Sequence, residues 1–243
     1  MHTQASRTAE IISQAESYDG IRAGIASLEN VLAGPSYQAG SKASPTARSS
    51  DDIRSSNWPA DAQSVLVLAM HHPEGDPRLD DWERGDTWGN RRLREISKEL
   101  QHWLRWAYHM STWPLPYHVG KGGLFLKDAA ALAGIGIIGQ NNLTVHPQWG
   151  PRIRLRAILL GGAFQSNGVL AGFSPCQNCP SLCQTACPMV AFPQGKYNRE
   201  ICKEQMNHNM KNRISRGELR ENGKRDLVIS YCRACETSCP VGA

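Results

Sequence analysis

Two cysteine runs decide the fold of this chain: Cys176-Gln-Asn-Cys179-Pro-Ser-Leu-Cys183-Gln-Thr-Ala-Cys187-Pro and Cys232-Arg-Ala-Cys235-Glu-Thr-Ser-Cys239-Pro. With Cys202 between them, they contain all eight cysteines of the 243 residues. Runs of this kind that end in Cys-Pro are typical of iron–sulfur proteins, in which the last cysteine of a run ligates the other cluster. Two [4Fe–4S] clusters need eight thiolates, so the spacing predicts a two-cluster, ferredoxin-like module from about residue 170 onward.

The crossing rule divides the cysteines into two predicted ligand sets. The first set is Cys176, Cys179, Cys183 and Cys239, and the second set is Cys187, Cys202, Cys232 and Cys235. Three cysteines of the first run are four residues apart, so a helix would place them on one face. The first run is one residue longer than the usual C-x2-C-x2-C-x3-C-P spacing, which leaves the role of Cys183 open.

Zinc and disulfides are the alternative interpretations of these cysteines. Zinc sites favour two C-x2-C pairs separated by a loop, rather than C-x3-C-x3-C-P. Disulfides need an oxidising compartment, and the N-terminal MHTQASRTAE has neither an apolar core nor a twin arginine for export. No stretch approaches the ~20 apolar residues of a membrane span. We therefore expect a cytoplasmic protein that does not use a membrane.

The rest of the chain predicts one sizeable mixed domain. A hydrophobic content of 40% allows a substantial core, and the net charge of +5 permits an anionic ligand or acidic partner without requiring nucleic acid. Patterning predicts helices at residues 7–17, 89–109 and 124–133, and strands at 21–26, 64–70 and 152–160. Residues 34–59 are rich in Ser, Pro and Gly and predict a long loop or lid. The expected fold is α+β, with domains at residues 1–168 and 169–243.

The central segment Gly134-Ile-Gly136-Ile-Ile-Gly139 matches the dinucleotide-binding pattern G-x-G-x-x-G. That site requires a preceding strand, a following helix and an acidic residue ~20 positions later. Here a helical Ala-rich segment precedes the glycines, and no acidic residue follows at that distance. The glycines predict instead a helix end at Gly134 and a close approach of backbone to another group.

Residues 119–147, VGKGGLFLKDAAALAGIGIIGQNNLTVHP, resemble the core segment of epoxyqueuosine reductases. The resemblance extends from about residue 65 through both cysteine runs, and the architecture is shared with reductive dehalogenases. It implies a nitroreductase-like α/β core that holds cobalamin, beside the ferredoxin-like two-cluster module. The corrinoid-binding residues implied are Gly120, Lys121, Gly122, Gly136, Ile137, Ile138, Gly139, Gln140, Asn141 and Asn142.

Three departures from the family separate this chain from a tRNA-modifying enzyme. The aspartate proposed to donate a proton aligns with Gly120, and the lysine of the family's G-K-N aligns with Gln140. The chain also ends at Ala243, without the helical-repeat extension that helps some members hold tRNA. The resemblance places Lys121, His118 and Tyr117 beside the reactive position, so these are the catalytic candidates.

Three functions remain open at this point. The first is a cobalamin-dependent reductase that acts on a small molecule or nucleotide, with tRNA disfavoured and a low-potential ferredoxin or flavodoxin as electron donor. The second is an electron-transfer or activation protein for a corrinoid or flavin partner. The third is a flavin-dependent reductase with FMN in place of cobalamin. Arg152, Arg154 and Arg156 alternate along one strand, and this cationic face either points to solvent or contacts an anion.

Overall fold

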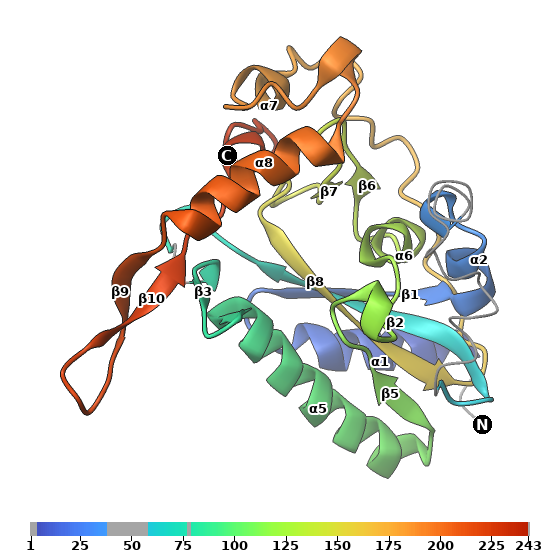
Figure 1. The fold of residues 1–243 in the computed structure, drawn as a ribbon. Helices are drawn as coiled ribbons and strands as arrows, with labels where there is room; N and C mark the ends of the chain where they lie inside the picture. Colours follow the sequence, from blue (N-terminus) through green and yellow to red (C-terminus); the bar gives the residue numbers. More distant parts are fainter. Residues whose placement is uncertain (1–3, 38–57, 77–78, 243) are drawn as a thin grey trace. The chain divides into compact units, whose positions relative to one another are not determined.

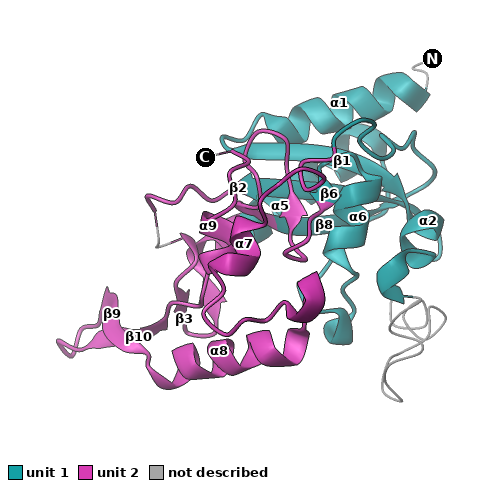
Figure 2. Ribbon diagram, turned by 90° about the horizontal axis from the view of Figure 1, so that it is seen from above, with its two compact units in different colours: residues 1–70, 93–137, 155–173 teal, residues 71–92, 138–154, 174–243 magenta. Residues whose placement is uncertain are grey.

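The chain divides into two units in a computed structural model that describes residues 4–37, 58–76 and 79–242 (Figure 2). The first unit comprises residues 1–70, 93–137 and 155–173, and the second comprises residues 71–92, 138–154 and 174–243. Each unit therefore combines segments that are distant in the sequence. The predicted domain boundary between residues 168 and 169 stays a prediction.

A four-stranded sheet forms the core of the first unit. Its strand order is β1-β2-β8-β5, with bounds β1 (Ile21–Ser27), β2 (Ala62–His71), β8 (Ile153–Gly161) and β5 (Thr112–Pro114). The pairs β1–β2 and β5–β8 are antiparallel. Val65 to Ala69 are fully buried, as expected of a continuous apolar run in a strand that is covered on both faces.

Helices cover this sheet: α1 (Gln4–Glu16), α2 (Leu28–Leu32), α5 (Trp88–Tyr108) and α6 (Leu126–Leu132), with the 3₁₀ turn η2 (Val119–Lys121). In α5, Leu93, Ile96, Leu100 and Leu104 recur every three or four residues and are buried. Both α1 and α6 pack against β1 (Figure 1). A Cβ at Gly24 of β1 would lie 2.0 Å from the carbonyl oxygen of Ala133, so only glycine allows the end of α6 to come this close.

The second unit is built from short elements. They are β3 (Trp82–Glu83), β4 (Asp86–Thr87), β7 (Thr144–Val145), α7 (Leu182–Thr185), η3 (Pro193–Gly195), α8 (Arg199–Lys211), β9 (Ile214–Leu219), β10 (Arg225–Ile229) and α9 (Ala234–Thr237). One sheet has the order β4-β3-β10-β9, and β7 pairs with β6 (Ile137–Ile138). The helices α7 and α9, which carry one cysteine each, contact one another.

The structure confirms the mixed α/β class and all six elements predicted from the patterning, each within three residues of its expected ends. Gly134 follows the last residues of α6 with a φ of +70°, which confirms it as a helix end. The predicted loop at residues 34–59 lies mostly outside the described residues. No helix among the described residues has both the length and the apolar character that a membrane span requires.

One expectation is wrong: Cys179, Cys183 and Cys187 do not share a helix. The helix α7 covers only residues 182–185, so it contains Cys183 alone. Pro180 disfavours a helical conformation at the residue before it, and Pro188 does the same at Cys187. The chain instead turns at Ser181, which has a left-handed backbone with φ +57°.

Candidate metal centre

The second unit carries all eight cysteines, and all are half-buried free thiols. They come from five segments: the turn before α7, α7 itself, the turn after it, α8, and the region around α9. Half-burial leaves each sulfur accessible to a ligand while the surrounding backbone fixes its position. The unit therefore presents its thiols from several short elements rather than from one regular surface.

The four thiols of the first predicted set influence one another electrostatically. Burial raises the pKa of the Cys183 thiol, and the neighbouring thiols of Cys239, Cys176 and Cys179 raise it further. Burial also raises the pKa of Cys239, with Cys176 and Cys179 acting in the same direction. The last cysteine of the second run therefore interacts electrostatically with cysteines of the first run.

Three thiols of the second predicted set are also neighbours. Burial raises the pKa of Cys235 to about 12, and the thiols of Cys232 and Cys202, the carboxylate of Glu236 and the thiol of Cys183 from the first set add to this shift. Tyr197 forms a hydrogen bond with the Cys202 thiol, and its own pKa is raised by burial and by that contact. The Sγ of Cys187 accepts a hydrogen bond from the backbone N–H of Ala191 at 3.3 Å, and its place in this set stays a prediction.

Residues of the glycine-rich segment make contact with both cysteine runs. The side chain of Gln140 donates to the carbonyl oxygen of Cys176 at 3.4 Å and accepts from the hydroxyl of Ser181 at 3.0 Å. The buried side chain of Asn141 donates to the carbonyl oxygen of Cys235 at 3.1 Å. Gln140 and Asn141 thus connect the backbones of the two runs through one short turn.

The turn at this position leaves no room for a side chain at Gly139. A Cβ there would lie 2.8 Å from the Cγ2 of Val145, 2.9 Å from the Oδ1 of Asn141 and 3.6 Å from the sulfur of Cys176. The closest approach to this glycine is therefore made by Val145 and Asn141, and the sulfur of Cys176 lies in ordinary van der Waals contact. The predicted corrinoid contacts of Ile138, Gly139, Gln140, Asn141 and Asn142 stay predictions, as do those of Gly136 and Ile137 in the first unit.

Arg152 is buried and holds the end of the second cysteine run. Its guanidinium donates to the carbonyl oxygens of Val241 at 2.9 Å, Cys239 at 3.0 Å and Thr237 at 3.1 Å. Arg156 is also buried, so the alternative of a solvent-facing row of arginines is wrong. The sequence could not reveal this, because the carbonyl acceptors lie more than 80 residues away in the chain.

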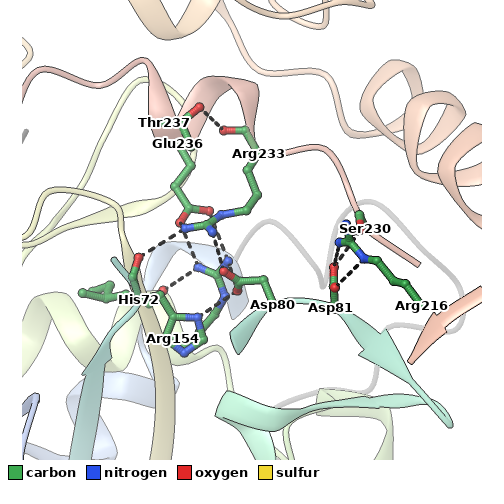
Figure 3. Close-up of polar contacts among 10 residues, drawn as sticks. His72, Asp80, Asp81, Arg154, Arg216, Ser230, Arg233, Glu236 and Thr237 are labelled. Atoms are coloured by element: carbon green, nitrogen blue, oxygen red, sulfur yellow. Dashed lines mark hydrogen bonds and ion pairs between the residues drawn. The ribbon is translucent and has the colours of Figure 1, made fainter. Parts of the chain in front are cut away.

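A buried network of ion pairs lies beside α9, and sequence reasoning missed it (Figure 3). Asp80 accepts a hydrogen bond from Nδ1 of His72 at 2.8 Å, and it forms ion pairs with Arg233, at 2.6 Å, and with Arg154. Arg154 and Arg233 both reach the buried Glu236, which follows Cys235 directly in the sequence. Asp80 lies in a polar segment whose sequence predicts an ordinary loop. No local pattern indicates that its side chain is shielded from solvent.

Burial and charge keep this network ionised around a neutral histidine. Burial lowers the pKa of His72, although its hydrogen bond to Asp80 acts in the opposite direction. For Asp80, burial acts to raise the pKa, but the hydrogen bond from His72 and the charges of Arg154 and Arg233 lower it overall. Asp80 is therefore an anion near neutral pH, and its two arginine partners compensate for its burial.

The three catalytic candidates lie in the first unit, close together around η2. The rings of Tyr117 and His118 are 5.3 Å apart, edge to face, and Lys121 ends η2. A Cβ at Gly120 would meet nothing within 4 Å, and the same is true of Gly122, whose φ is +91°. The carbonyl oxygen of Gly122 accepts a hydrogen bond from the indole of Trp58 at 3.0 Å. Their catalytic and corrinoid-binding roles stay predictions.

Comparison with known proteins finds relatives at low sequence identity. No protein-family model matches the chain. An epoxyqueuosine reductase of Lactococcus garvieae (strain Lg2) is 22% identical over 197 residues, which are 74% of this chain and 52% of the relative. A crystal structure of epoxyqueuosine reductase with an epoxyqueuosine-modified tRNA-Tyr stem loop has a TM-score of 0.65 and 20% identity, and the match covers 99% of this chain and 66% of that one.

A reductive dehalogenase structure, which suggests a mechanism for B12-dependent dehalogenation, is also similar. Its TM-score is 0.53 at 15% identity, over 75% of this chain and 26% of that one. The chain thus resembles epoxyqueuosine reductases in sequence and fold and reductive dehalogenases in fold, which confirms the resemblance predicted from its sequence. It spans about half the length of the curated relative and just under two thirds of the reductase structure.

Proposed function

We propose that this chain is an iron–sulfur reductase of the corrinoid-dependent type, with a nitroreductase-like first unit and two [4Fe–4S] clusters in the second. When bound, these groups would supply one-electron transfer and a low-valent cobalt that reduces the substrate. The chain itself would position both groups, exclude water and deliver a proton. The observation that carries the proposal is the electrostatic interaction of the Cys239 thiol with those of Cys176, Cys179 and Cys183, as expected from the crossing rule of two-cluster proteins.

The spacing of the sulfur atoms supports clusters over single zinc ions. Tetrahedral zinc with bonds of ~2.3 Å draws four sulfurs to about 3.8 Å from one another. In the described part of the chain, the one group of three or more potential ligands within 4.8 Å is Glu83, Glu218 and Asp226, which contains no cysteine. The thiols are close enough to interact and yet more widely spaced than a single zinc ion requires.

Each set also has a neighbouring group suited to a charged cluster. The buried Arg152 brings a positive charge to the backbone around Cys239, and this charge lowers the pKa of that thiol against the effect of its burial. Tyr197 offers a hydroxyl to Cys202, and hydrogen bonds to cluster sulfurs are one means by which proteins tune reduction potentials. These residues would stabilise thiolates that burial alone disfavours.

Metal analysis of protein reconstituted under anaerobic conditions tests this proposal. We expect about eight iron and about eight sulfide per chain. Replacement of Cys202 by Ala should remove about half of the iron and half of the sulfide. The control Met206→Ala, one turn further along α8, should leave the iron and sulfide contents unchanged. Stoichiometric zinc, or full iron retention in the Cys202 variant, would contradict the assignment of ligands.

The corrinoid requires a separate measurement. Equilibrium titration with cobalamin, followed by visible absorption, should show binding and a change of band shape. Tight uptake of flavin mononucleotide without uptake of cobalamin would instead establish the flavin-dependent alternative. Replacement of Gly120 by Val tests the open segment around η2, since its side chain would enter space that is empty at present.

The substrate test starts from Gly120. A positioned proton donor typically contributes roughly 10²–10⁴-fold to rate, and the family's aspartate is absent at this position. We expect little reduction of epoxyqueuosine-containing tRNA by the unmodified protein, and more by Gly120→Asp, which the open space at Gly120 accommodates. Robust turnover by the unmodified protein would show that Lys121, His118 or Tyr117 already supplies the proton.

A second candidate function is that of an electron-transfer or activation protein for a corrinoid on a partner. The missing carboxylate at Gly120 favours it, because such a protein needs no proton donor of its own. It predicts that reconstituted clusters form normally while cobalamin does not bind, a combination that the two measurements above would reveal.

A further inference from the structure

The hairpin of β9 and β10 is the most exposed regular element of the second unit. It extends outward from the end of α8 (Figure 1), and five of the six residues of β9 are exposed. Residues 211–226 contain six Lys or Arg against three Asp or Glu, and all six cations are exposed. A short ribbon with this excess of positive charge creates a local field that attracts an anionic partner.

Ion pairs fix the hairpin to its sheet. The buried carboxylate of Asp226 binds Arg220 and accepts from the Nε of Arg84 at 2.6 Å. Arg216 pairs with Asp81, with distances of 3.0 and 2.6 Å (Figure 3). Although burial opposes ionisation of Asp226, hydrogen bonds from Arg220 and Arg84 keep its pKa below the usual range. These ion pairs therefore hold the hairpin in a fixed position on its sheet.

Pairing with arginine also explains why three carboxylates lie close together on this sheet. Glu83, Glu218 and Asp226 lie within 4.8 Å of one another, but Arg84 pairs with both Glu218 and Asp226. The carboxylate of Glu83 accepts from the backbone N–H of Glu218 at 2.7 Å. These carboxylates are used to hold the strands together, and they carry no separate metal site.

Other cations of the hairpin remain available. Arg213 and Lys224 make no ion pair with any residue that the structure describes. With Arg84, Arg220 and Arg225 they line a recess of about 440 Å³ beside Trp82. Three apolar side chains are exposed on the same hairpin: Ile214 at 47%, Leu219 at 62% and Leu227 at 49%. Arginine combined with exposed apolar side chains is typical of protein–protein interfaces.

The hairpin connects two cysteines of one predicted set. The helix α8 carries Cys202 and ends at Lys211, three residues before β9, and Cys232 follows the end of β10 by three residues. The side chain of Asn209 on α8 accepts from the backbone N–H of Cys232 at 3.1 Å, so the two ends of this connection are held together. A partner on the hairpin would therefore sit on the segment that leads directly to these cysteines.

We propose that the β9–β10 hairpin is the docking surface of an acidic one-electron carrier protein, and that electrons enter at the cluster of Cys202, Cys232 and Cys235. This inference rests on the proposed iron–sulfur function. In the transfer, the reduced centre of the carrier loses one electron and the cluster gains it, and no bond forms or breaks. A protein fits better than RNA because Ile214, Leu219 and Leu227 would be covered by apolar side chains, which a phosphate backbone does not offer.

A charge-reversal comparison tests the docking surface. The reconstituted full chain is mixed with a reduced, strongly acidic flavodoxin, and cluster reduction is followed by stopped-flow absorbance. The hairpin variant is Arg213→Glu with Lys224→Glu, and the control is Lys98→Glu with Arg105→Glu, two exposed cations of α5 with the same total charge change. At ~20 mM ionic strength we expect the second-order rate to fall at least ~10-fold in the hairpin variant and less than ~2-fold in the control. The difference should shrink at ~0.5 M salt.

Equal slowing of both variants would show that only net charge matters and would overturn the docking surface, as would an unchanged rate in the hairpin variant. Loss of salt-sensitive tRNA binding, with the flavodoxin rate retained, would also overturn it and would assign the hairpin to nucleic acid. Dithionite separates this inference from the function on which it rests. It should reduce the clusters of the unmodified protein and of both variants alike, and its failure with the unmodified protein would contradict the iron–sulfur function instead.

Discussion

The interior of the first unit is mainly apolar, whereas the second unit contains buried ion pairs and half-buried thiols. In the first, β2 contributes a fully buried run from Val65 to Ala69, and helices cover it with leucine and isoleucine. In the second, most elements have two to six residues, and its buried groups include Arg152, Asp226 and Glu236. This difference indicates that hydrophobic burial can stabilise the fold of the first unit. The fold of the second unit depends on paired charges and, in our proposal, on bound metal clusters.

Removal of the clusters should produce the largest difference between the units. Extraction of iron by an anaerobic chelator should increase amide hydrogen exchange at residues 174–211 at least ~100-fold, because a structural metal commonly supplies about 10–16 kcal/mol of folding free energy. The amides of β2 should not change. Unchanged protection at residues 174–211 would mean that protein contacts alone order the cysteine segments.

The buried network offers the next largest effect. Asp80→Asn keeps the size of the side chain but removes the carboxylate shared by His72, Arg154 and Arg233. Breaking a buried ion pair on one side typically costs about 3–5 kcal/mol, and we expect a loss of this size in the free energy of opening of the second unit. Native-state hydrogen exchange at β3 and α9 measures it, and a loss below ~1 kcal/mol would show that the network contributes little.

The sequence predicted the first unit well because its signals are local. The run Ser64 to Met70 and the helical spacing in α5 each determine one element from adjacent residues, and both elements form as predicted. The cysteine spacing also predicted two ligand sets, which stay predictions, and the electrostatic interaction of Cys239 with Cys176, Cys179 and Cys183 is consistent with the first of them. These patterns need no knowledge of distant partners.

Long-range polar contacts were not predictable in the same way. The alternating arginines of β8 suggested a solvated face as one alternative, yet Arg152 and Arg156 are buried. The guanidinium of Arg152 donates hydrogen bonds to carbonyl oxygens around Cys239. The carboxylate of Asp80 pairs with arginines that are about 75 and 150 positions away in the chain. The short α7 was mispredicted for a local reason, because the two prolines that flank it outweigh the helical spacing of the cysteines.

Substitution of a buried glycine, Gly24, tests the close packing of the first unit. Gly24→Ala would bring a methyl group against the carbonyl oxygen of Ala133, and overpacking of this kind typically costs about 1–3 kcal/mol. The loss should appear in the exchange of β1 and β2 amides and leave iron content unchanged. Gly120→Ala is the matched control, since its methyl group would enter open space. Equal effects of the two substitutions would show that the end of α6 moves aside freely.

The smallest effect should come from the residue next to Asp80. Asp81 also pairs with an arginine, but its partner Arg216 is 44% exposed, and the pair lies at the surface (Figure 3). Exposed pairs contribute about 0–1 kcal/mol and are screened by salt, so Asp81→Asn should cost no more than this, and less at ~0.5 M salt. The adjacent substitutions Asp80→Asn and Asp81→Asn remove the same charge from side chains of similar exposure, 11% and 14%, so they differ mainly in their partners. Asp80 faces a buried histidine and two half-buried arginines, whereas Asp81 faces an exposed arginine. A cost for Asp81→Asn equal to that for Asp80→Asn would mean that the anchoring of the hairpin contributes as much to the stability of the second unit as the network around Asp80.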